Sequence, residues 1–398
     1  MPTISKKGLD MPESPIRKLA PYAEQAKKSG KHIHHLNIGQ PDIKTPENAL
    51  QAVKDNNLEI LAYSPSQGFE SYRQKLAEHY EKHDIHLTAD QIMVTTGGSE
   101  ALLFVMGSIT DPGDDVVIAE PFYANYSGFA TSMNVNVKPV TAKLEDNFAL
   151  PPIEEFEAAI TDKTRAIILC NPGNPTGYIY TRKEMEAIAK LAQKHDLFVV
   201  ADEVYREFAY EDSKHHSILS FPEIEDRAIM CDSVSKRFSM CGARIGCLAT
   251  KNQDVLDAAL KFAQARLSPP TFAQIAAEEA LSVDESYFEE VIEEYQNRRD
   301  ILIACLNEID GLTIAQPKGA FYCTVKLPVE DAEHFAKWLL ESFDVDSETL
   351  MVAPAAGFYS TPGLGKSEIR IAYVLKKESI KRSIHVLKEG LKTYRELN

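Results

Sequence analysis

The sequence predicts an α/β protein with a large domain, built on a mainly parallel sheet of seven strands between helices, and a smaller α+β domain. The chain has 398 residues, enough for two domains with substantial cores. From residue 91 to 250, short apolar runs alternate with amphipathic segments, which is typical of parallel strands connected by helices. After residue 283 a long helical stretch is followed by short strands and helices in a different order. The change of pattern predicts the second domain.

Residues 1–45 are expected to form an N-terminal arm and part of the smaller domain. Residues 14–30 predict a helix, because apolar residues recur at helical spacing between Ser14, a favourable cap, and Gly30, a common stop. Residues 31–42 then begin as a strand and break into a loop at glycine and proline.

Residues 46–283 are expected to form the large domain. Two helices come first, one starting at Thr45 and one near 69–83, with the turn-rich loop YSPSQG between them. Seven apolar runs then predict strands near 91–95, 115–119, 134–139, 165–170, 197–201, 228–231 and 245–250. Ligands of such sheets bind at the carboxyl ends of the strands, so polar motifs at those ends are candidates for a site.

Residues 284–398 are expected to form the smaller domain. Its first element is a long helix over ESYFEEVIEEYQNRRDILIACLNEI, which leads into the apolar run GAFYCTVKL. A helix near 331–342, strands near 350 and 369–374, and a final helix follow. Helices and short strands in this order indicate an α+β arrangement.

Composition excludes several classes of function. The net charge of -16 argues against nucleic acid as a partner, because no basic patch is available to neutralise phosphates. The six cysteines form no CxxC pair, which favours reduced core residues over disulfides or a zinc site, and no metal is expected. No signal peptide or membrane-length apolar run is present, so we expect a cytoplasmic protein without a membrane partner.

One stretch, DSVSKRFSMCGARIG over residues 232–246, concentrates reactive groups between two apolar runs. A neutral lysine amine attacks carbonyls, and partial burial or a nearby cation lowers its pKa, so Lys236 is a candidate for a Schiff base. Arg244 has the geometry to bind a phosphate bidentately, and Ser233 and Ser235 add hydroxyls. Taken alone, this stretch is equally well explained as a surface Lys/Arg pair in a basic loop.

The motif TTGGSEAL follows the first predicted strand of the large domain and opens a helix. Paired glycines there allow backbone N–H groups to approach an anion, to which Gly98 and Ser99 would contribute. A tight strand-to-helix turn is an equally good explanation. The motif is not GxGxxG, and no GxxxxGK[ST] occurs, so dinucleotide and nucleotide binding are not supported.

Two further motifs end apolar strands. In NPGNPTG, the Asn-Pro steps restrict the backbone and hold the Asn174 side chain in a fixed direction. In ADEVYREF, Asp202 ends a strand and can pair with a cationic ring nitrogen, while Tyr205 can donate to an oxygen of the same ring. Alone, Asp202 could be a helix cap. The other motifs around it favour a functional role.

NPGNPTG followed by SxSKxxxxxGxRxG, in this order and spacing, resembles the class I/II aminotransferases, which are pyridoxal 5′-phosphate (PLP) enzymes of fold type I. The resemblance runs from NIGQPD near residue 37 to RIAYV near residue 374. It implies that Lys236 forms the Schiff base with PLP and that Asp202 pairs with the pyridine nitrogen. It also implies that Tyr205 and Asn174 bond the phenolic oxygen of the ring.

The same resemblance implies the remaining site residues. The phosphate-binding positions are Gly98, Ser99, Ser233, Ser235 and Arg244. Tyr123 matches the aromatic residue that stacks on the cofactor ring, and Tyr63 matches a tyrosine that reaches the phosphate of the neighbouring subunit, which implies a homodimer with shared sites. Arg370 matches the arginine that binds the substrate α-carboxylate, together with Asn174, and Gly39 lies in the loop that closes over the substrate. An interdomain salt bridge is the alternative for Arg370.

The implied activity is transfer of an amino group from an L-amino acid, with aspartate favoured, to a 2-oxo acid such as 2-oxoglutarate. In one acidic-substrate branch of the family a lysine follows the paired glycines, whereas Ser99 occupies that position here, which weakens the aspartate preference. Arg266 lies near a family segment that can supply a second arginine across the dimer. A loop arginine tied to a local acid explains Arg266 equally well.

Three alternatives remain open at this point. The donor could be alanine or an aromatic amino acid, and the same scaffold catalyses β-elimination of sulfur amino acids as a C–S β-lyase. The fold also serves as the ligand-sensing domain of transcription regulators. Those regulators carry an added DNA-binding segment, and the residues before Gly39 are too few and not basic enough to form one.

Overall fold

The computed structural model describes residues 2–397, and its largest element is a seven-stranded sheet of order β2-β8-β7-β6-β5-β3-β4. β8 is antiparallel to both of its neighbours and the other pairings are parallel. The predicted mainly parallel sheet is therefore confirmed. Its strands are β2 (Ile92–Thr95), β3 (Asp115–Glu120), β4 (Asn136–Thr141), β5 (Thr164–Cys170), β6 (Phe198–Asp202), β7 (Ala228–Ser233) and β8 (Gly246–Thr250).

Helices cover both faces of this sheet, because successive strand residues point to opposite sides and most of them are apolar. Val116 and Val200 pack into a cluster with α5, α6 and α10, whereas Val117 and Val199 pack into another with α3, α4, α7, α8 and α11. These helices are α3 (Glu47–Lys54), α4 (Glu70–Glu81), α5 (Gly97–Ile109), α6 (Asn125–Met133), α7 (Ile153–Ala159), α8 (Arg182–Lys194), α10 (Gln253–Arg266) and α11 (Thr271–Ala280). The four-residue helix α9 (Val234–Arg237) follows β7 directly.

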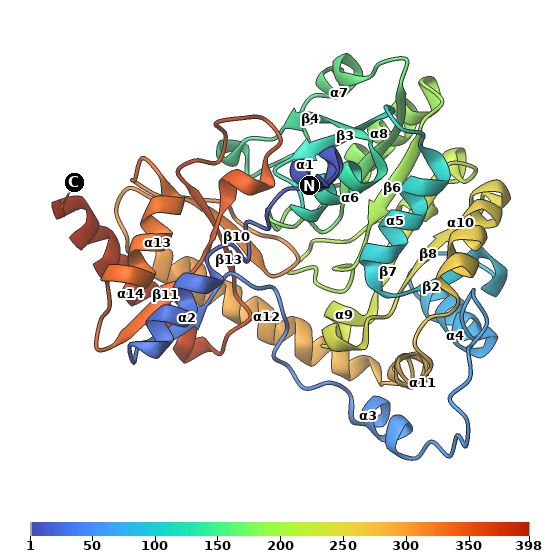
Figure 1. Ribbon diagram of the computed structural model, residues 1–398, viewed down its shortest axis with the longest axis horizontal. Coiled ribbons are helices and arrows are strands. Elements are labelled where there is room, and N and C mark those ends of the chain that lie inside the picture. The colour runs from blue at the N-terminus through green and yellow to red at the C-terminus, as the bar shows by residue number, and fades with distance from the viewer. Residues whose placement is uncertain (1, 398) are drawn as a thin grey trace.

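A smaller α+β part lies beside the main sheet, at the left of Figure 1. It contains an antiparallel sheet of order β12-β13-β10-β9 and a parallel pair in which N-terminal β1 joins β11. Its strands are β1 (His32–His35), β9 (Thr313–Ile314), β10 (Tyr322–Lys326), β11 (Glu348–Met351), β12 (Ala353–Pro354) and β13 (Glu368–Ala372). Its helices are α2 (Ala20–Lys28), α12 (Glu285–Leu306), α13 (Ala332–Ser342) and α14 (Lys377–Leu397).

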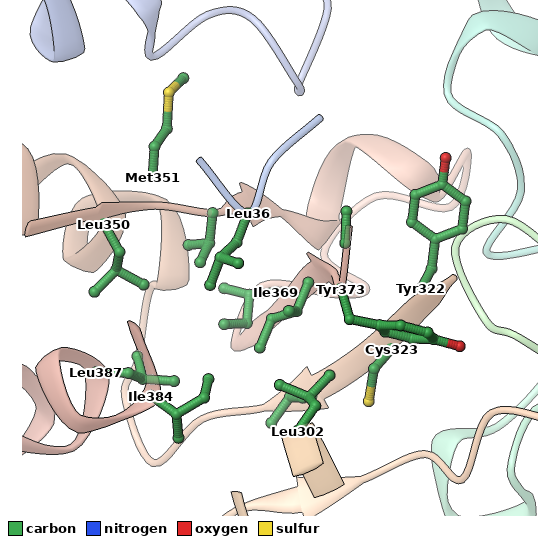
Figure 2. Packing of buried hydrophobic residues seen from close by; sticks show 14 of the residues in the cluster. Leu36, Leu302, Tyr322, Cys323, Leu350, Met351, Ile369, Tyr373, Ile384 and Leu387 are labelled. Atoms are coloured by element: carbon green, nitrogen blue, oxygen red, sulfur yellow. The ribbon is translucent and has the colours of Figure 1, made fainter. Parts of the chain in front are cut away.

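The long helix α12 connects the two parts. Phe288 near its start packs against the core of the main sheet, whereas Leu302 near its end is buried in the core of the smaller part. Figure 2 shows Leu36, from the segment after β1, among residues such as Ile369 and Tyr373 of that second core. N-terminal residues thus pack with C-terminal elements. The boundaries at residues 45 and 283 stay predictions.

The predicted helix over residues 14–30 is wrong in its first third. Residues 15–19 form turns, and α2 begins only at Ala20. The side chain of Asn37 donates to the Ile16 carbonyl at 2.9 Å, a group that a helix starting at Ser14 would use in its own ladder. Pro15 packs so closely on Gly357 that a Cβ there would lie 2.4 Å from the Cβ of Pro15.

The remaining predicted elements lie within a few residues of the observed ones. The largest shift in the main sheet is at β4, which starts two residues later than the predicted 134–139 run. Before α2, the short helix α1 (Lys6–Asp10) lies near α6, where Lys7 donates to the Ser132 carbonyl at 2.9 Å. None of the helices described is long and apolar enough to cross a membrane.

Candidate active site

A cavity of about 600 Å³ lies at the carboxyl ends of β6 and β7. This is the edge of a parallel sheet at which ligands are expected. Every site residue predicted from the sequence lines the cavity except Tyr63: the lining includes Gly39, Gly98, Ser99, Tyr123, Asn174, Asp202, Tyr205, Ser233, Ser235, Lys236, Arg244 and Arg370. Residues far apart in the sequence therefore meet in one place.

Lys236 projects into this cavity from α9, immediately after β7. Its Nζ donates to the carbonyl of Gly39 at 2.7 Å and lies 5.8 Å from the centre of the Tyr205 ring. Burial lowers the pKa of Lys236, and the positive charges of Arg370 and Arg244 add to this effect. A lowered pKa leaves more of the amine neutral, which is the form that attacks a carbonyl.

Asp202 is the last residue of β6, and its two carboxylate oxygens differ in their surroundings. The hydroxyl of Tyr126 donates to Oδ2 at 2.9 Å. Oδ1 is buried and has no hydrogen-bond partner among the residues that the structure describes. Burial raises the pKa of Asp202 to about 6, so the carboxyl is mostly ionised at neutral pH. Oδ1 can therefore accept from a cationic donor of a ligand.

Asn174 and Tyr205 lie side by side, and a residue that the sequence motifs did not indicate joins them. The hydroxyls of Tyr205 and Tyr322 are 2.8 Å apart, and Asn174 Nδ2 lies 3.5 Å from the Tyr205 hydroxyl. The amide of Asn174 and the hydroxyl of Tyr205 thus lie together at one point of the cavity. Gly39 approaches Tyr322 so closely that a Cβ at this position would lie 1.8 Å from the tyrosine oxygen, which explains the need for glycine.

Arg370 is a deeply buried cation on β13, with 1% of its surface exposed. Nη1 donates to Asn174 Oδ1 at 3.0 Å, and Nη2 donates to the carbonyl of Asn37. Its guanidinium lies 4.5 Å from the centre of the Tyr322 ring. Among residues 2–397 no carboxylate forms an ion pair with it, so the salt-bridge alternative lacks a partner. Burial lowers the pKa of Arg370, because removal from water disfavours the charged form of the guanidinium.

The glycine turn before α5 and the loop after α9 form the opposite wall of the cavity. Gly97 has a φ of +76°, and a Cβ there would lie 2.5 Å from Nη2 of Arg244. Glycine thus allows the guanidinium to approach the N-terminus of α5. The Ser233 and Ser235 hydroxyls are 2.8 Å apart on the same wall. N–H groups, hydroxyls and a guanidinium together suit a phosphate.

Tyr63 and Arg266, the two remaining residues considered from the sequence, both lie outside the cavity lining. Tyr63 is 78% exposed and lies outside the cavity of its own chain. Arg266 is the last residue of α10 and not a loop residue, and its Nη1 is 2.8 Å from Oε2 of Glu100. Its Nη2 also donates to the Ser66 carbonyl at 3.0 Å. Arg266 therefore pairs with a local acid, which agrees with the second of the two interpretations given from the sequence.

Comparison with known proteins places the whole chain in one family. The family model described as aminotransferase class I and II matches residues 31–387. The chain belongs to the class I and II aminotransferases. An aspartate aminotransferase of Pyrococcus horikoshii is 31% identical over 395 residues, which cover 98% of this chain and 97% of that protein. Aromatic-amino-acid aminotransferase 2 of Thermococcus litoralis is 32% identical over 388 residues, covering 95% and 96% of the two chains.

Solved aminotransferases share this fold. The structure of aspartate aminotransferase from Thermus thermophilus with maleate has a TM-score of 0.89 and 28% identity, and the match covers 98% of this chain and 100% of that chain. The protein is thus a PLP-dependent aminotransferase of fold type I. The residues present fit this cofactor. The unpartnered Oδ1 of Asp202 suits the protonated ring nitrogen, and the wall formed by Gly98, Ser235 and Arg244 suits the phosphate.

Three residues of this aminotransferase site were missed by the motifs. Tyr322 contacts Tyr205 and Arg370, Tyr126 holds Asp202, and Asn37 accepts from Arg370. Tyr322 lies in the apolar run GAFYCTVKL, where one more aromatic residue looks like core. Asn37 belongs to the motif NIGQPD, and Tyr126 lies three residues after Tyr123 in the stretch PFYANY, but no spacing rule indicates which polar residue in such a stretch faces the site.

Proposed function

We propose that this aminotransferase moves the amino group of an L-amino acid, with aspartate as the favoured donor, to a 2-oxo acid such as 2-oxoglutarate. One observation carries the assignment of roles: the amine of Lys236, the unpartnered oxygen of Asp202 and the buried guanidinium of Arg370 all line one cavity. An amine, an acid for a ring nitrogen and a cation for a carboxylate are the groups that amino transfer on PLP requires.

Different residues of the cavity would bind different parts of the cofactor. When bound, PLP supplies an aldehyde that takes up the amino group and a ring that delocalises negative charge. Asp202 would keep the ring nitrogen protonated, Tyr205 and Asn174 would donate to the phenolic oxygen, and Tyr123 would contact the ring. Gly98, Ser99, Ser233, Ser235 and Arg244 would hold the phosphate.

Lys236 has two roles in this proposal, as the Schiff-base lysine and as the base that takes the α-proton of the substrate. Its lowered pKa favours the neutral amine in both roles. Arg370 and Asn174 bind the α-carboxylate and thereby fix the direction of the α-C–H bond, which is a positioning effect. The loop at Gly39 covers the bound substrate, since its carbonyl already contacts the Lys236 amine.

Aspartate is favoured because relatives from Pyrococcus and Thermus over nearly the full chain are named aspartate aminotransferases. An aromatic donor is the second candidate, since the Thermococcus relative is equally similar and is named for aromatic amino acids. The Ser99 hydroxyl supplies no charge for a second carboxylate. The preference therefore depends on another cation in the cavity.

We also propose a homodimer with shared sites, in which Tyr63 reaches the phosphate of the partner subunit. Support comes from the exposure of Tyr63 and of its apolar neighbours Ile60 and Leu61, which are 77% and 60% exposed. The six cysteines are free, which suits a reducing compartment, and we propose the cytoplasm. Nucleic acid and membranes are not proposed as partners.

A donor panel tests the activity. Purified protein with PLP is incubated with aspartate, alanine, phenylalanine or cystathionine, each with 2-oxoglutarate, and glutamate, pyruvate and ammonia are measured. Glutamate formed fastest from aspartate supports the proposal. Pyruvate with ammonia from cystathionine would support a C–S β-lyase instead. Borohydride reduction followed by peptide mass spectrometry should place the cofactor on Lys236, and a label elsewhere would refute that role.

A further inference from the structure

We propose that Arg17 binds the distal carboxylate of a dicarboxylic substrate and so gives this site its preference for acidic amino acids. The inference rests on the proposed function and names the substrate class within it. Arg17 lies in the turn before α2 and lines the same cavity as Lys236 and Arg370. None of the sequence motifs indicated it.

One cationic side chain of the cavity has no assigned partner in the proposed site. Its lining contains four cationic side chains, those of Arg17, Lys236, Arg244 and Arg370, and one carboxylate, that of Asp202. In the proposed site Lys236 is bonded to the cofactor, Arg244 faces the phosphate and Arg370 faces the α-carboxylate. Arg17 is then the one cation of the lining to which none of these groups is assigned, and a second carboxylate on the substrate would pair with it.

Arg17 is available for a ligand. Within residues 2–397 no acidic side chain forms an ion pair with it. The next residue, Lys18, does have such a partner: its Nζ pairs with Glu333 outside the cavity. The two adjacent cations thus differ in a way that favours a ligand-binding role for Arg17 and a structural role for Lys18.

The backbone of this turn is fixed relative to Arg370. Asn37 donates to the Ile16 carbonyl at 2.9 Å with its side chain and accepts from Arg370 Nη2 with its own carbonyl. One residue therefore links the turn that carries Arg17 to the arginine proposed for the α-carboxylate. Contact of Pro15 with Gly357 fixes the turn from the other side. A turn held at both ends fixes the backbone at Arg17, whose exposed side chain lies on the cavity lining.

Arginine suits a carboxylate because its planar guanidinium forms two parallel charge-assisted hydrogen bonds with it. An aromatic donor is the competing interpretation, because a guanidinium also stacks on aromatic rings. Ile16 and Ile38 in the same lining would favour an apolar substrate side chain. The absence of any acid beside Arg17 in the lining favours the carboxylate, since an unpaired charge gains more from an anion than from a ring.

The test compares Arg17→Gln, Arg17→Lys and, as a matched control, Lys18→Gln, each as the PLP-loaded enzyme. Binding of maleate, an unreactive dicarboxylate, and of isocrotonate, its monocarboxylate counterpart of the same cis geometry, is followed by the change in cofactor absorbance. We expect Arg17→Gln to weaken maleate binding about 10- to 100-fold, the range for a lost charge-assisted pair, with a much smaller effect on isocrotonate. Arg17→Lys should restore part of the loss, because it keeps the charge but not the fork.

Kinetics provide the second readout. The ratio of kcat/KM for aspartate to kcat/KM for alanine should fall by a similar factor in Arg17→Gln and stay at the wild-type value in Lys18→Gln. An unchanged ratio together with unchanged maleate binding would overturn the role of Arg17, as would a selective loss of phenylalanine turnover. Wild-type protein that transfers no amino group from any donor would instead refute the proposed function, so the two failures are distinguishable.

Discussion

At the scale of single residues, the chemistry depends on how burial and neighbouring charges shift the pKa values of three ionisable groups. Burial and the cations around it lower the pKa of Lys236, whereas Asp202 retains its charge despite a pKa raised to about 6. Burial lowers the pKa of Arg370, but the guanidinium remains charged because arginine is not deprotonated in proteins. Each shift has burial as its first cause, and each matches the role proposed for the group.

Replacing Lys236 by alanine should abolish turnover while leaving the fold intact. We expect kcat to fall at least about 10²-fold, the lower limit for loss of a general base, because both the covalent link and the base are removed. The phosphate wall is unchanged, so the variant should still bind PLP, more weakly. Steady-state kinetics and cofactor titration check both expectations.

Lys251→Ala is a matched control, since Lys251 pairs with Glu225 at the surface, 2.9 Å away. Its turnover should equal that of the wild type. Turnover of Lys236→Ala within tenfold of the wild type would contradict the assigned role.

At the scale of elements, a buried ionic cluster lies directly behind the site. Its members are Glu203, Arg206, Glu207, Asp232 and Arg237. Each is adjacent in sequence to a residue of the site, as Arg237 is to Lys236 and Asp232 to Ser233, except Glu207, which is two positions from Tyr205. Arg237 pairs with both oxygens of Asp232 and lies 3.3 Å from Glu207, so the cluster fixes α9 against the end of β7.

Removing the charge of Arg237 should destabilise the protein strongly. Arg237→Met leaves Asp232 and Glu207 buried with less compensation, and breaking such a pair costs about 3–5 kcal/mol of the free energy of unfolding. Arg227→Met is the surface control: its partners Asp196 and Asp226 are exposed, and the expected cost is about 0–1 kcal/mol. Urea unfolding at pH 7 measures both. Equal midpoints for the two variants would contradict this account.

The difference between wild type and Arg237→Met should depend on pH. Burial alone would raise the pKa of Asp232, but Arg237 and Arg206 hold it below the ordinary value, and Glu207 behaves in the same way. A depressed pKa contributes stability that is present above the ordinary carboxylate pKa of about 4 and is lost as pH falls through the folded value. The difference between the two proteins should therefore be full at pH 7 and shrink below about pH 4.

The same cluster argues against a metal site that the spacing of three nearby side chains would otherwise suggest. His79, His83 and Glu207 bring three ligand-type atoms within 4.8 Å of one another. Arg237 donates to Nε2 of His79 at 3.1 Å and also lies beside Glu207. A guanidinium occupies the place where a cation would bind, so we interpret the group as part of the ionic cluster.

Much of the fold and the site could be predicted because the relevant signals are local. Apolar runs determine the strands, and the motifs around Lys236 and Asn174 carry their own turn residues. The start of α2 could not be predicted, since it depends on Asn37 reaching back to Ile16 across the fold. The ionic cluster was missed for a similar reason: charged residues beside motif residues look like a solvated face until the packing of α4 on them is known.

At the scale of the whole molecule, one apolar surface segment remains uncovered in the single chain. Ile60, Leu61 and Tyr63 are each at least 60% exposed, and a cavity lined by Leu61 and Tyr63 also includes Thr96, beside the glycine turn of the phosphate wall. Consecutive exposed apolar residues are typical of an association surface. The proposed dimer would cover this segment and bring Tyr63 to the partner's site.

We expect the protein to sediment at about twice the mass of one chain. Ile60→Asp combined with Leu61→Asp should shift it towards monomer, because two charges would be buried in an apolar contact, and activity per chain should fall with the dimer fraction. Leu397→Asp, at a residue 66% exposed on the end of α14, is the control and should stay dimeric. Sedimentation equilibrium at several concentrations measures the change. A monomeric wild type with full activity would contradict shared sites.

The buried guanidinium on β13 has a practical consequence for any assay. Within the part of the chain that the structure describes, an amide oxygen and a peptide carbonyl are the only hydrogen-bond acceptors of this buried cation, so it will attract small anions of every kind, not substrates alone. Chloride, acetate and phosphate in the buffer will compete with the amino acid, and the apparent KM will rise linearly with their concentration. Donor preferences measured in bulky sulfonate buffers at low chloride will therefore be the ones that reflect the protein.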